Sequence, residues 1–366
     1  MKYVKIEEMK NLSVLIKPAS SLCNLRCRYC FYIDESQNRE EENHGIMEEE
    51  VMLKLTERIA EAMEDGGQVH ISFQGGEPTV AGLAYFRSFV SAMDQYRGFD
   101  ISYSIQTNGT LLNEEWARFF HDHHFLVGVS LDGYESNMNQ FRYDAKHKGA
   151  YLQVIQGIDL LEKYDVEYNI LTVVTEELSR HPKALLQFYK SHKFKYVQLI
   201  PCLPPLNNGD DISLKPQQYA SFYIEFFRHW KKEVQKGNVI SVNLFENIMA
   251  MLNGYPPYQC GMSGRCSRQT IVEANGDVYP CDFYCLDVYR LGNIMDQSLD
   301  ELSKTKVAEE FIRTSACEKK ICESCYFRNI CHGGCRRQNI CYLEDHYCAY
   351  QAVLREIVPQ LMELRK

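Results

Sequence analysis

Three cysteines near the amino terminus, Cys23, Cys27 and Cys30, have the spacing C-x3-C-x2-C. Thiolates on one short loop can ligate three irons of a four-iron cluster. Such clusters normally take four thiolates, so the fourth iron is left open to another molecule. A zinc site that lacks its fourth ligand is the alternative interpretation.

Cysteine is abundant and unevenly placed, with 15 residues in a chain of 366. Besides the amino-terminal triplet and Cys202, eleven cysteines fall between Cys260 and Cys348. An odd number cannot pair completely. The amino terminus has no apolar stretch of the signal-peptide kind, so we expect a cytoplasmic chain, in which structural disulfides are rare. The clustering therefore favours metal or cluster ligation.

The composition bounds the class of protein. Hydrophobic residues make up 45% and charged residues 24% of the chain, as in soluble globular proteins. No apolar run reaches the length of a membrane span. A net charge of −9 argues against a nucleic-acid partner, because binding phosphates needs a basic face. We expect neither a membrane nor a nucleic acid as a partner.

The elements that must position the cysteines alternate along the first two-thirds of the chain. Strands are predicted at 13–17, 69–73, 102–106, 126–131, 167–174 and 196–200. Helices are predicted at 48–63, 83–96, 114–121, 151–164, 181–192 and 217–236. This alternation predicts βαβ units and a parallel sheet. Six units favour an α/β fold of the partial (β/α)6 TIM-like barrel type, followed by a cysteine-rich carboxyl-terminal domain.

The loops after the first four predicted strands should converge on one rim of the barrel, where such folds place their sites. They carry the cysteine triplet, Gly75-Gly76-Glu77-Pro78, Thr107-Asn108-Gly109 and Asp132-Gly133. We place the domain boundary between residues 236 and 237, where the composition shifts to short strands, turns and cysteines, and expect domains at 1–236 and 237–366. The charged stretch 35–43 is predicted to be a mobile surface loop.

With its cysteine triplet and its GGEP segment, the chain resembles the radical S-adenosylmethionine (radical SAM) superfamily. The resemblance implies that the open iron binds S-adenosylmethionine and that one electron releases a 5′-deoxyadenosyl radical. It also implies that Gly75, Gly76 and Glu77 contact the methionine ammonium group, and that Ser130 binds its carboxylate. Arg142 matches a family arginine, although the His-Asp pair that usually precedes it is absent here.

The carboxyl-terminal cysteines resemble the SPASM extension of radical enzymes that modify peptides. The resemblance implies two auxiliary 4Fe–4S clusters, and so three in total. The first would use Cys260, Cys266, Cys281 and Cys335. The second would use Cys322, Cys325, Cys331 and Cys348. Cys202, Cys285, Cys317 and Cys341 remain unassigned, and a ligand swap with Cys317 or Cys341 stays open. Zinc is the alternative metal for all of these cysteines, because cysteine spacing alone does not distinguish a zinc site from an iron–sulfur site.

Several longer segments resemble anaerobic sulfatase-maturating enzymes, which oxidise one Cys or Ser of a sulfatase to Cα-formylglycine. They are Leu-Ile-Lys-Pro-Ala-Ser-Ser (15–21), Cys-Phe-Tyr (30–32), Phe-Gln-Gly-Gly-Glu-Pro-Thr (73–79), Gln-Thr-Asn-Gly-Thr (106–110), Tyr-Pro-Cys-Asp-Phe-Tyr (279–284) and Arg-Leu-Gly-Asn-Ile (290–294). The resemblance implies that the radical abstracts a hydrogen from the substrate Cβ. Asp282 would be the base, Gln74 and Gln106 would hold the peptide, and Tyr32 and Asn108 would lie near the adenosyl group.

The implied partners are an unfolded sulfatase or peptide substrate and an electron donor such as flavodoxin or ferredoxin. A SPASM maturase of ribosomal peptides, forming thioether or other crosslinks or D-residues, is the nearest rival. Such maturases often carry an additional amino-terminal domain, whereas only about a dozen residues precede the first predicted strand here. A non-catalytic zinc-binding scaffold is the rival from another class.

Overall fold

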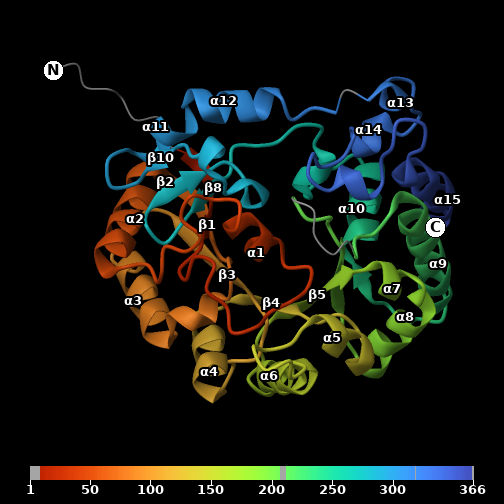
Figure 1. The fold of residues 1–366 in the computed structure, drawn as a ribbon, viewed down its shortest axis with the longest axis horizontal. Helices are drawn as coiled ribbons and strands as arrows, with labels where there is room; N and C mark the ends of the chain where they lie inside the picture. Colours follow the sequence, from red (N-terminus) through yellow and green to blue (C-terminus); the bar gives the residue numbers. More distant parts are fainter. Residues whose placement is uncertain (1–8, 207–211, 318, 365–366) are drawn as a thin grey trace.

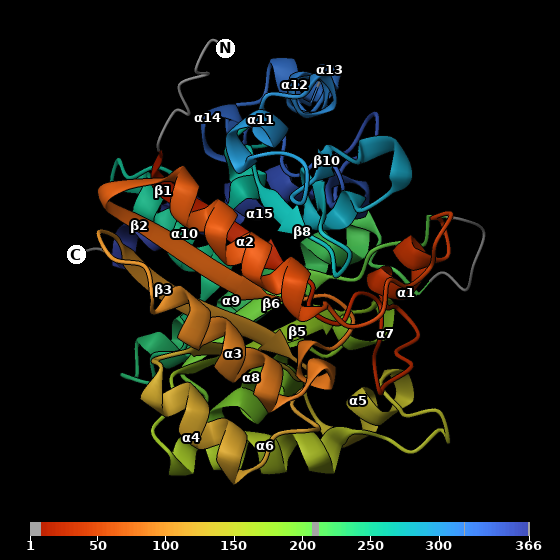
Figure 2. The same cartoon turned by 90° about the vertical axis from the view of Figure 1, so that its left-hand side faces the viewer.

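The chain folds around a parallel sheet, shown from two directions in Figures 1 and 2. The structure, a computed structural model, describes residues 9–206, 212–317 and 319–364. The first six strands are β1 (Met9–Ile16), β2 (Met63–Phe73), β3 (Asp100–Thr107), β4 (Leu126–Ser130), β5 (Tyr168–Val174) and β6 (Tyr196–Pro201). Each pairs in parallel with the next. The predicted α/β partial barrel is confirmed.

Helices connect these strands, and most of them cover the outer face of the sheet (Figure 1). They are α1 (Phe31–Ser36), α2 (Glu49–Ala62), α3 (Leu83–Met93), α4 (Glu114–Asp122), α5 (Glu135–Phe141), α6 (Tyr151–Lys163), α7 (Glu176–Ser179), α8 (Pro182–Ser191) and α9 (Pro216–Val234). The six helices predicted from periodicity are present with small shifts at their ends. Among the described residues, no helix has the length and apolar character needed to cross a membrane.

Alternation along the strands sorts side chains between the outer core and the inner cavity. On β2, Ile71 and Phe73 are buried, and Phe73 packs against Phe86 of α3 with ring centroids 4.8 Å apart. Ser72 of the same strand lines the inner cavity, as do Ser104 and Gln106 of β3. The period of two thus gives the sheet an apolar outer face and a largely polar inner face.

The sheet continues past the six predicted strands at both edges. Within the described residues it has ten strands in the order β10-β9-β8-β1-β2-β3-β4-β5-β6-β7. The added strands are β7 (Ser241–Val242), β8 (Thr270–Val272), β9 (Asp277–Tyr279) and β10 (Gly292–Asn293). β8 pairs with β1 in parallel, and Val272 lies opposite Ile16. The carboxyl-terminal segment therefore extends the barrel sheet directly, across the boundary predicted at 236/237.

The remaining helices belong to the carboxyl-terminal segment and form an arc that runs from α11, beside α2, to α15, beside α9 (Figure 1). They are α10 (Asn243–Leu252), α11 (Leu299–Ser303), α12 (Lys306–Arg313), α13 (Lys320–Glu323), α14 (Arg328–Cys331) and α15 (Ala349–Leu364). α15 packs against α9 along the outside of the molecule. Most of these helices are short, because the cysteine-bearing loops between them occupy much of the segment.

The prediction of a mobile surface loop at 35–43 is wrong in part. Glu35 and Ser36 end α1 and are buried, and Arg39 is only 9% exposed. Arg39 Nη1 donates to Glu273 Oε1 at 2.7 Å, far away in the sequence. The charges in this stretch gave it a solvated pattern, but partners from the carboxyl-terminal segment allow them to be buried.

Candidate active site

The carboxyl ends of the barrel strands surround a cavity of about 680 Å³, within the size range of small-ligand sites. Its lining includes all the residues predicted for cofactor, substrate and catalytic roles: Tyr32, Gln74, Gly75, Gly76, Glu77, Gln106, Asn108, Ser130, Arg142 and Asp282. It also includes Cys23, Cys27, Cys30, Cys260, Cys266, Cys281 and Cys335. Residues predicted from separate loops are therefore brought to one place.

The amino-terminal cysteines lie on the loop between β1 and α1. Arg142 Nη1 donates to Cys27 Sγ at 3.9 Å, and Asn108 Nδ2 donates to Cys23 Sγ at 3.8 Å. Burial raises the pKa of both thiols, Cys23 and Cys27, to about 12. Cluster ligands bind as thiolates, so iron binding must drive the release of these protons.

The GGEP turn after β2 packs against the chain that leads into the cysteine loop. Gly76 N–H donates to Ser20 O at 2.8 Å, and Glu77 N–H donates to Leu22 O at 2.7 Å. A Cβ at Gly76 would collide with Leu22 O, and Gly75 has a φ of 118°. Both positions therefore require glycine for reasons internal to the protein. The absence of side chains at Gly75 and Gly76 lets the GGEP backbone pack closely against the chain that leads into the cysteine loop.

The Glu77 carboxylate is buried and accepts hydrogen bonds from its own protein. Oε1 accepts from Thr79 Oγ1 at 2.6 Å and Thr107 Oγ1 at 2.7 Å, while Oε2 accepts from Asn108 N at 2.6 Å. Burial raises the pKa of Glu77, and these donors oppose that rise. Glu77 thus joins the loops that follow β2 and β3. Asn108, predicted near the adenosyl group, is held against the cysteine loop.

Arg142 sits in a buried polar group behind the cysteine loop. Its Nε donates to Asp132 Oδ2 at 2.8 Å, and Tyr29 OH donates to the same oxygen. Asp132 Oδ1 accepts from Val173 N at 2.9 Å. Burial opposes the charge on Arg142, but Asp132 and Cys27 raise its pKa. Arg142 therefore stays a cation directed at the cysteine loop.

Gln106 and Ser130, which were predicted to bind the peptide and the cofactor, lie on adjacent strands and are joined by a hydrogen bond. Gln106 Nε2, from β3, donates to Ser130 Oγ at the end of β4 at 3.1 Å. A Cβ at Gly128 would collide with Gln106 Oε1, so glycine here makes room for the amide. Gln74 lines the cavity from the neighbouring strand end. Amide groups consequently face the cavity from two adjacent strands.

Asp282 lies where the barrel meets the carboxyl-terminal segment. Tyr32 OH donates to Asp282 Oδ2 at 2.7 Å. Lys17 Nζ lies 3.4 Å from Asp282 Oδ1, and it also sits over the Tyr32 ring, 4.8 Å from its centroid. Asp282 Oδ1 is buried and makes no hydrogen bond to any described residue. That oxygen has the capacity to accept a hydrogen bond from a bound molecule.

A buried charge network is centred on Lys17, and it was not predicted from the sequence. Its Nζ donates to Cys285 Sγ at 3.1 Å and to Glu35 Oε2 at 3.4 Å, and lies 3.8 Å from Glu273 Oε1. Burial alone would lower the pKa of Lys17, but the surrounding acidic groups raise it well above the ordinary value. Burial raises the pKa of Glu35 to about 7. A lysine at the end of an apolar strand was the available sequence signal.

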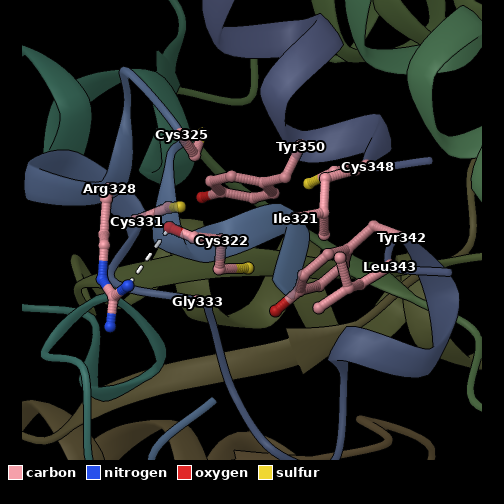
Figure 3. Close-up of a pocket in the computed structure, with 10 residues that line it drawn as sticks. All are labelled: Ile321, Cys322, Cys325, Arg328, Cys331, Gly333, Tyr342, Leu343, Cys348 and Tyr350. Carbon is pink, nitrogen blue, oxygen red and sulfur yellow. Dashed lines mark hydrogen bonds between the residues drawn. The ribbon is translucent and has the colours of Figure 1, made fainter. Parts of the chain in front are cut away.

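The carboxyl-terminal cysteines form two separate groups. Cys260, Cys266, Cys281 and Cys335 line the central cavity. Cys322, Cys325, Cys331 and Cys348 line a second pocket together with Tyr342 and Tyr350 (Figure 3). Tyr342 also lines the central cavity, and its OH accepts from Cys335 N at 3.0 Å. The structure therefore divides the eight cysteines into the two sets of four that the sequence predicted, with Tyr342 between them.

Two regions of the chain match models of known protein families. Residues 18–189 match the radical SAM superfamily, and residues 260–326 match an iron–sulfur cluster-binding domain, SPASM. A cysteine-type anaerobic sulfatase-maturating enzyme of Clostridium novyi (strain NT) is 41% identical, over 90% of this chain and 89% of that protein. The chain belongs to the anaerobic sulfatase-maturating enzymes. It is therefore a radical SAM enzyme with a SPASM domain, and the zinc-scaffold alternative is wrong.

Other members of the family agree with this result. The serine-type enzyme of Bacteroides thetaiotaomicron is 31% identical over 92% of this chain and 85% of that protein. A solved structure described as native anSMEcpe with bound AdoMet and Cp18Cys peptide superimposes with a TM-score of 0.88 at 38% identity, covering 97% of this chain and 98% of that one. The cofactors expected from the sequence, S-adenosylmethionine and three 4Fe–4S clusters, are those of this family.

The four unassigned cysteines have distinct surroundings. Cys202, Cys285 and Cys341 are buried, and Cys341 Sγ donates to Cys202 O at 3.4 Å. Cys285 belongs to the Lys17 network. Cys317 is half-buried, with its Sγ 3.8 Å from Cys322 Sγ. The four thiols therefore differ in their burial and in the groups that they contact.

Proposed function

We propose that this anaerobic sulfatase-maturating enzyme acts on a cysteine, oxidising it to Cα-formylglycine in a sulfatase chain. The observation that supports cysteine as the target is that sequence identity is higher to the cysteine-type relatives than to the serine-type relatives. The cysteine-type relatives are 39–41% identical, and the serine-type relatives are 30–31% identical. The substrate of the solved relative is a peptide by its description, which supports an extended chain as substrate.

The proposed cofactor sites follow the grouping of thiols. Cys23, Cys27 and Cys30 would hold the cluster that binds S-adenosylmethionine, and the two carboxyl-terminal sets would hold the auxiliary clusters. When bound, S-adenosylmethionine supplies a 5′-deoxyadenosyl radical that removes a hydrogen atom from the substrate Cβ. The cavity fits this ligand because a cation, Arg142, a hydroxyl, Ser130, and the GGEP turn line it together.

Asp282 is the proposed base. The thiol of the substrate donates its proton to Asp282 Oδ1, a buried oxygen that makes no hydrogen bond to any described residue and lies 3.4 Å from Lys17 Nζ. Loss of the Cβ hydrogen atom, the thiol proton and one electron forms a C=S bond. Water then replaces the sulfur, releasing hydrogen sulfide and leaving the aldehyde. Tyr32 and Lys17 hold the carboxylate in place. Cys281, the residue before Asp282, would help to hold an auxiliary cluster, and such a cluster would supply an acceptor for the departing electron.

Gln74 and Gln106 are proposed to bind the substrate main chain, since an amide can donate and accept at once. Gln106 already donates to Ser130, so its Oε1 is the atom that would accept from a peptide N–H. The electron needed to start each cycle would come from a flavodoxin or ferredoxin. We propose that this enzyme works in the cytoplasm, on sulfatase chains that have not yet folded.

The test is anaerobic incubation of the reconstituted enzyme with reductant, S-adenosylmethionine and matched peptides containing Cys-x-Pro-x-Arg or Ser-x-Pro-x-Arg. We expect the aldehyde mass from the cysteine peptide at a rate at least about 10-fold above that from the serine peptide. Equal or faster oxidation of the serine peptide would overturn the cysteine assignment. A crosslinked product without aldehyde would point to peptide maturation.

The matched variant is Asp282→Asn, which keeps the size of the side chain but cannot accept a proton in this role. We expect 5′-deoxyadenosine formation to persist while aldehyde formation falls by about 100-fold or more, the scale of general-base catalysis. Asp296→Asn, in a turn before α11, is the control. Full peptide oxidation by Asp282→Asn would remove Asp282 from the base role.

A further inference from the structure

A fifth cysteine stands at the second auxiliary site. Cys317 precedes α13 and is half-buried, and its Sγ lies 3.8 Å from Cys322 Sγ, close to van der Waals contact. Cys322 is one of the four cysteines that line the pocket in Figure 3. Five thiols thus gather where a four-iron cluster takes four.

The pocket wall is shaped to admit this fifth thiol. Gly333, which lines the pocket, has a φ of 96° and faces Cys317 directly. A Cβ at Gly333 would collide with Cys317 Cβ and lie 3.3 Å from its Sγ. Only a residue without a side chain allows Cys317 to lie so close to the cluster-binding thiols.

The short distance between Cys317 Sγ and Cys322 Sγ identifies the iron that Cys317 would bind. Thiolates on a four-iron cluster each bind a different iron and point away from one another, so sulfurs in contact cannot serve different corners. Two of the other cysteines contact a different residue: Gln351 Nε2 donates to Cys325 Sγ at 3.2 Å, and Gln351 N donates to Cys348 Sγ at 3.3 Å. Cys317 therefore competes with Cys322 for a single iron.

We propose that Cys317 is a reserve ligand of the second auxiliary cluster, able to replace Cys322 on its iron. The exchange breaks one Fe–S(thiolate) bond and forms another. The Cys317 thiol loses a proton, the displaced Cys322 thiolate gains one, and no electron moves. This inference rests on the proposed assignment of Cys322, Cys325, Cys331 and Cys348 to that cluster.

Iron content of full-length, anaerobically reconstituted variants tests the inference, with the electron paramagnetic resonance spectrum of the reduced clusters as a second readout. We expect Cys322→Ala to keep its iron and show a shifted auxiliary signal. Cys317→Ala should keep its iron with an unshifted signal. The double variant Cys317→Ala/Cys322→Ala should lose about a third of its iron, one cluster of three, as should Cys325→Ala, which has no spare thiol.

Different outcomes would contradict the reserve role of Cys317 and the assignment of the four cluster ligands. A loss of iron in Cys322→Ala equal to that in Cys325→Ala would overturn the reserve role. Retention of all iron by the double variant would overturn it as well, because solvent would then be filling the corner. Retention of all iron by Cys325→Ala would instead overturn the ligand assignment itself. Far-UV circular dichroism and gel filtration check that each variant is folded.

Discussion

Lys17 is a fully buried cation that touches the proposed base. Three carboxylates, Glu35, Glu273 and Asp282, lie within 3.8 Å of its ammonium group. Removing one partner from a buried ion pair is strongly destabilising, because the remaining charges lose their compensation. We therefore regard Lys17 as a positioning residue for Asp282.

Lys17→Met should lower both stability and the efficiency of oxidation. The loss of a buried partner is expected to cost about 3–5 kcal/mol. The informative measurement is the ratio of aldehyde to 5′-deoxyadenosine, which we expect to fall at least about 10-fold as radical formation becomes uncoupled from oxidation. Lys54→Met, at an exposed ion pair on α2, is the control. An unchanged ratio in Lys17→Met would restrict Lys17 to a structural role.

Glu35→Gln should change the pH dependence of stability. Burial raises the pKa of Glu35 to about 7, so the folded chain holds this proton where the unfolded chain releases it. The stabilisation is present below the unfolded pKa and is lost as pH rises through about 7. The melting temperature of the variant, relative to the unmodified enzyme, should therefore rise between about pH 5.5 and about pH 8. A constant difference would contradict the prediction.

At the scale of elements, the site depends on loops that pack on one another. The GGEP turn contacts residues 20–22, and Glu77 bonds the loop after β3. These contacts join the ends of three adjacent strands before any ligand arrives. The cysteine loop is consequently pre-positioned by the protein, in keeping with how well-formed sites are built.

Gly76→Ala tests this packing. The added methyl group collides with Leu22 O, a backbone atom that cannot move without shifting the cysteine loop. We expect the loss of about four of about twelve irons and at least a 10-fold fall in S-adenosylmethionine cleavage, with the auxiliary signals kept. Gly237→Asn, after α9, is the control because a Cβ there meets nothing within 4 Å. Normal cleavage by Gly76→Ala would contradict this view of the turn.

The strands and the connecting helices were predictable because their signals are local, whereas the cavity residues were predicted from the resemblance to a known family. Apolar periodicity marked the elements, and short motifs at strand ends converged by the geometry of parallel sheets. The Lys17 network was not predictable in this way. Lys17, Glu35 and Glu273 are ordinary charged residues in their own segments, and only the pairing of β8 with β1 brings them together. The same pairing buried Arg39, which the sequence pattern placed in a mobile loop.

At the scale of the whole molecule, one sheet spans both family regions. β8, β9 and β10 of the SPASM segment continue the barrel sheet next to β1, and β7 closes the other edge. Lys17 N–H donates to Val272 O at 2.8 Å. Two independently folding domains would require few contacts across their boundary. The predicted division at 236/237 therefore separates regions of sequence that share a core.

Unfolding should accordingly be a single cooperative event. In anaerobic calorimetry of the reconstituted enzyme, we expect one transition, with far-UV circular dichroism and the visible absorption of the clusters changing together. Because each probe reports a different region, coincidence is the decisive observation. Two well-separated transitions, with cluster loss preceding barrel unfolding, would show that the SPASM segment unfolds independently.

The position of β8 beside β1 also constrains how this chain is made. β1 leaves the ribosome long before its outer neighbour, β8, which begins only at Thr270. One edge of β1 stays unpaired until β8 has been made, and such edges are templates for wrong pairing. Asp282 reaches Tyr32 later still. The nascent chain thus cannot place its proposed base beside Tyr32 before Asp282 emerges, so a shorter chain lacks the residue that would take the proton of the substrate.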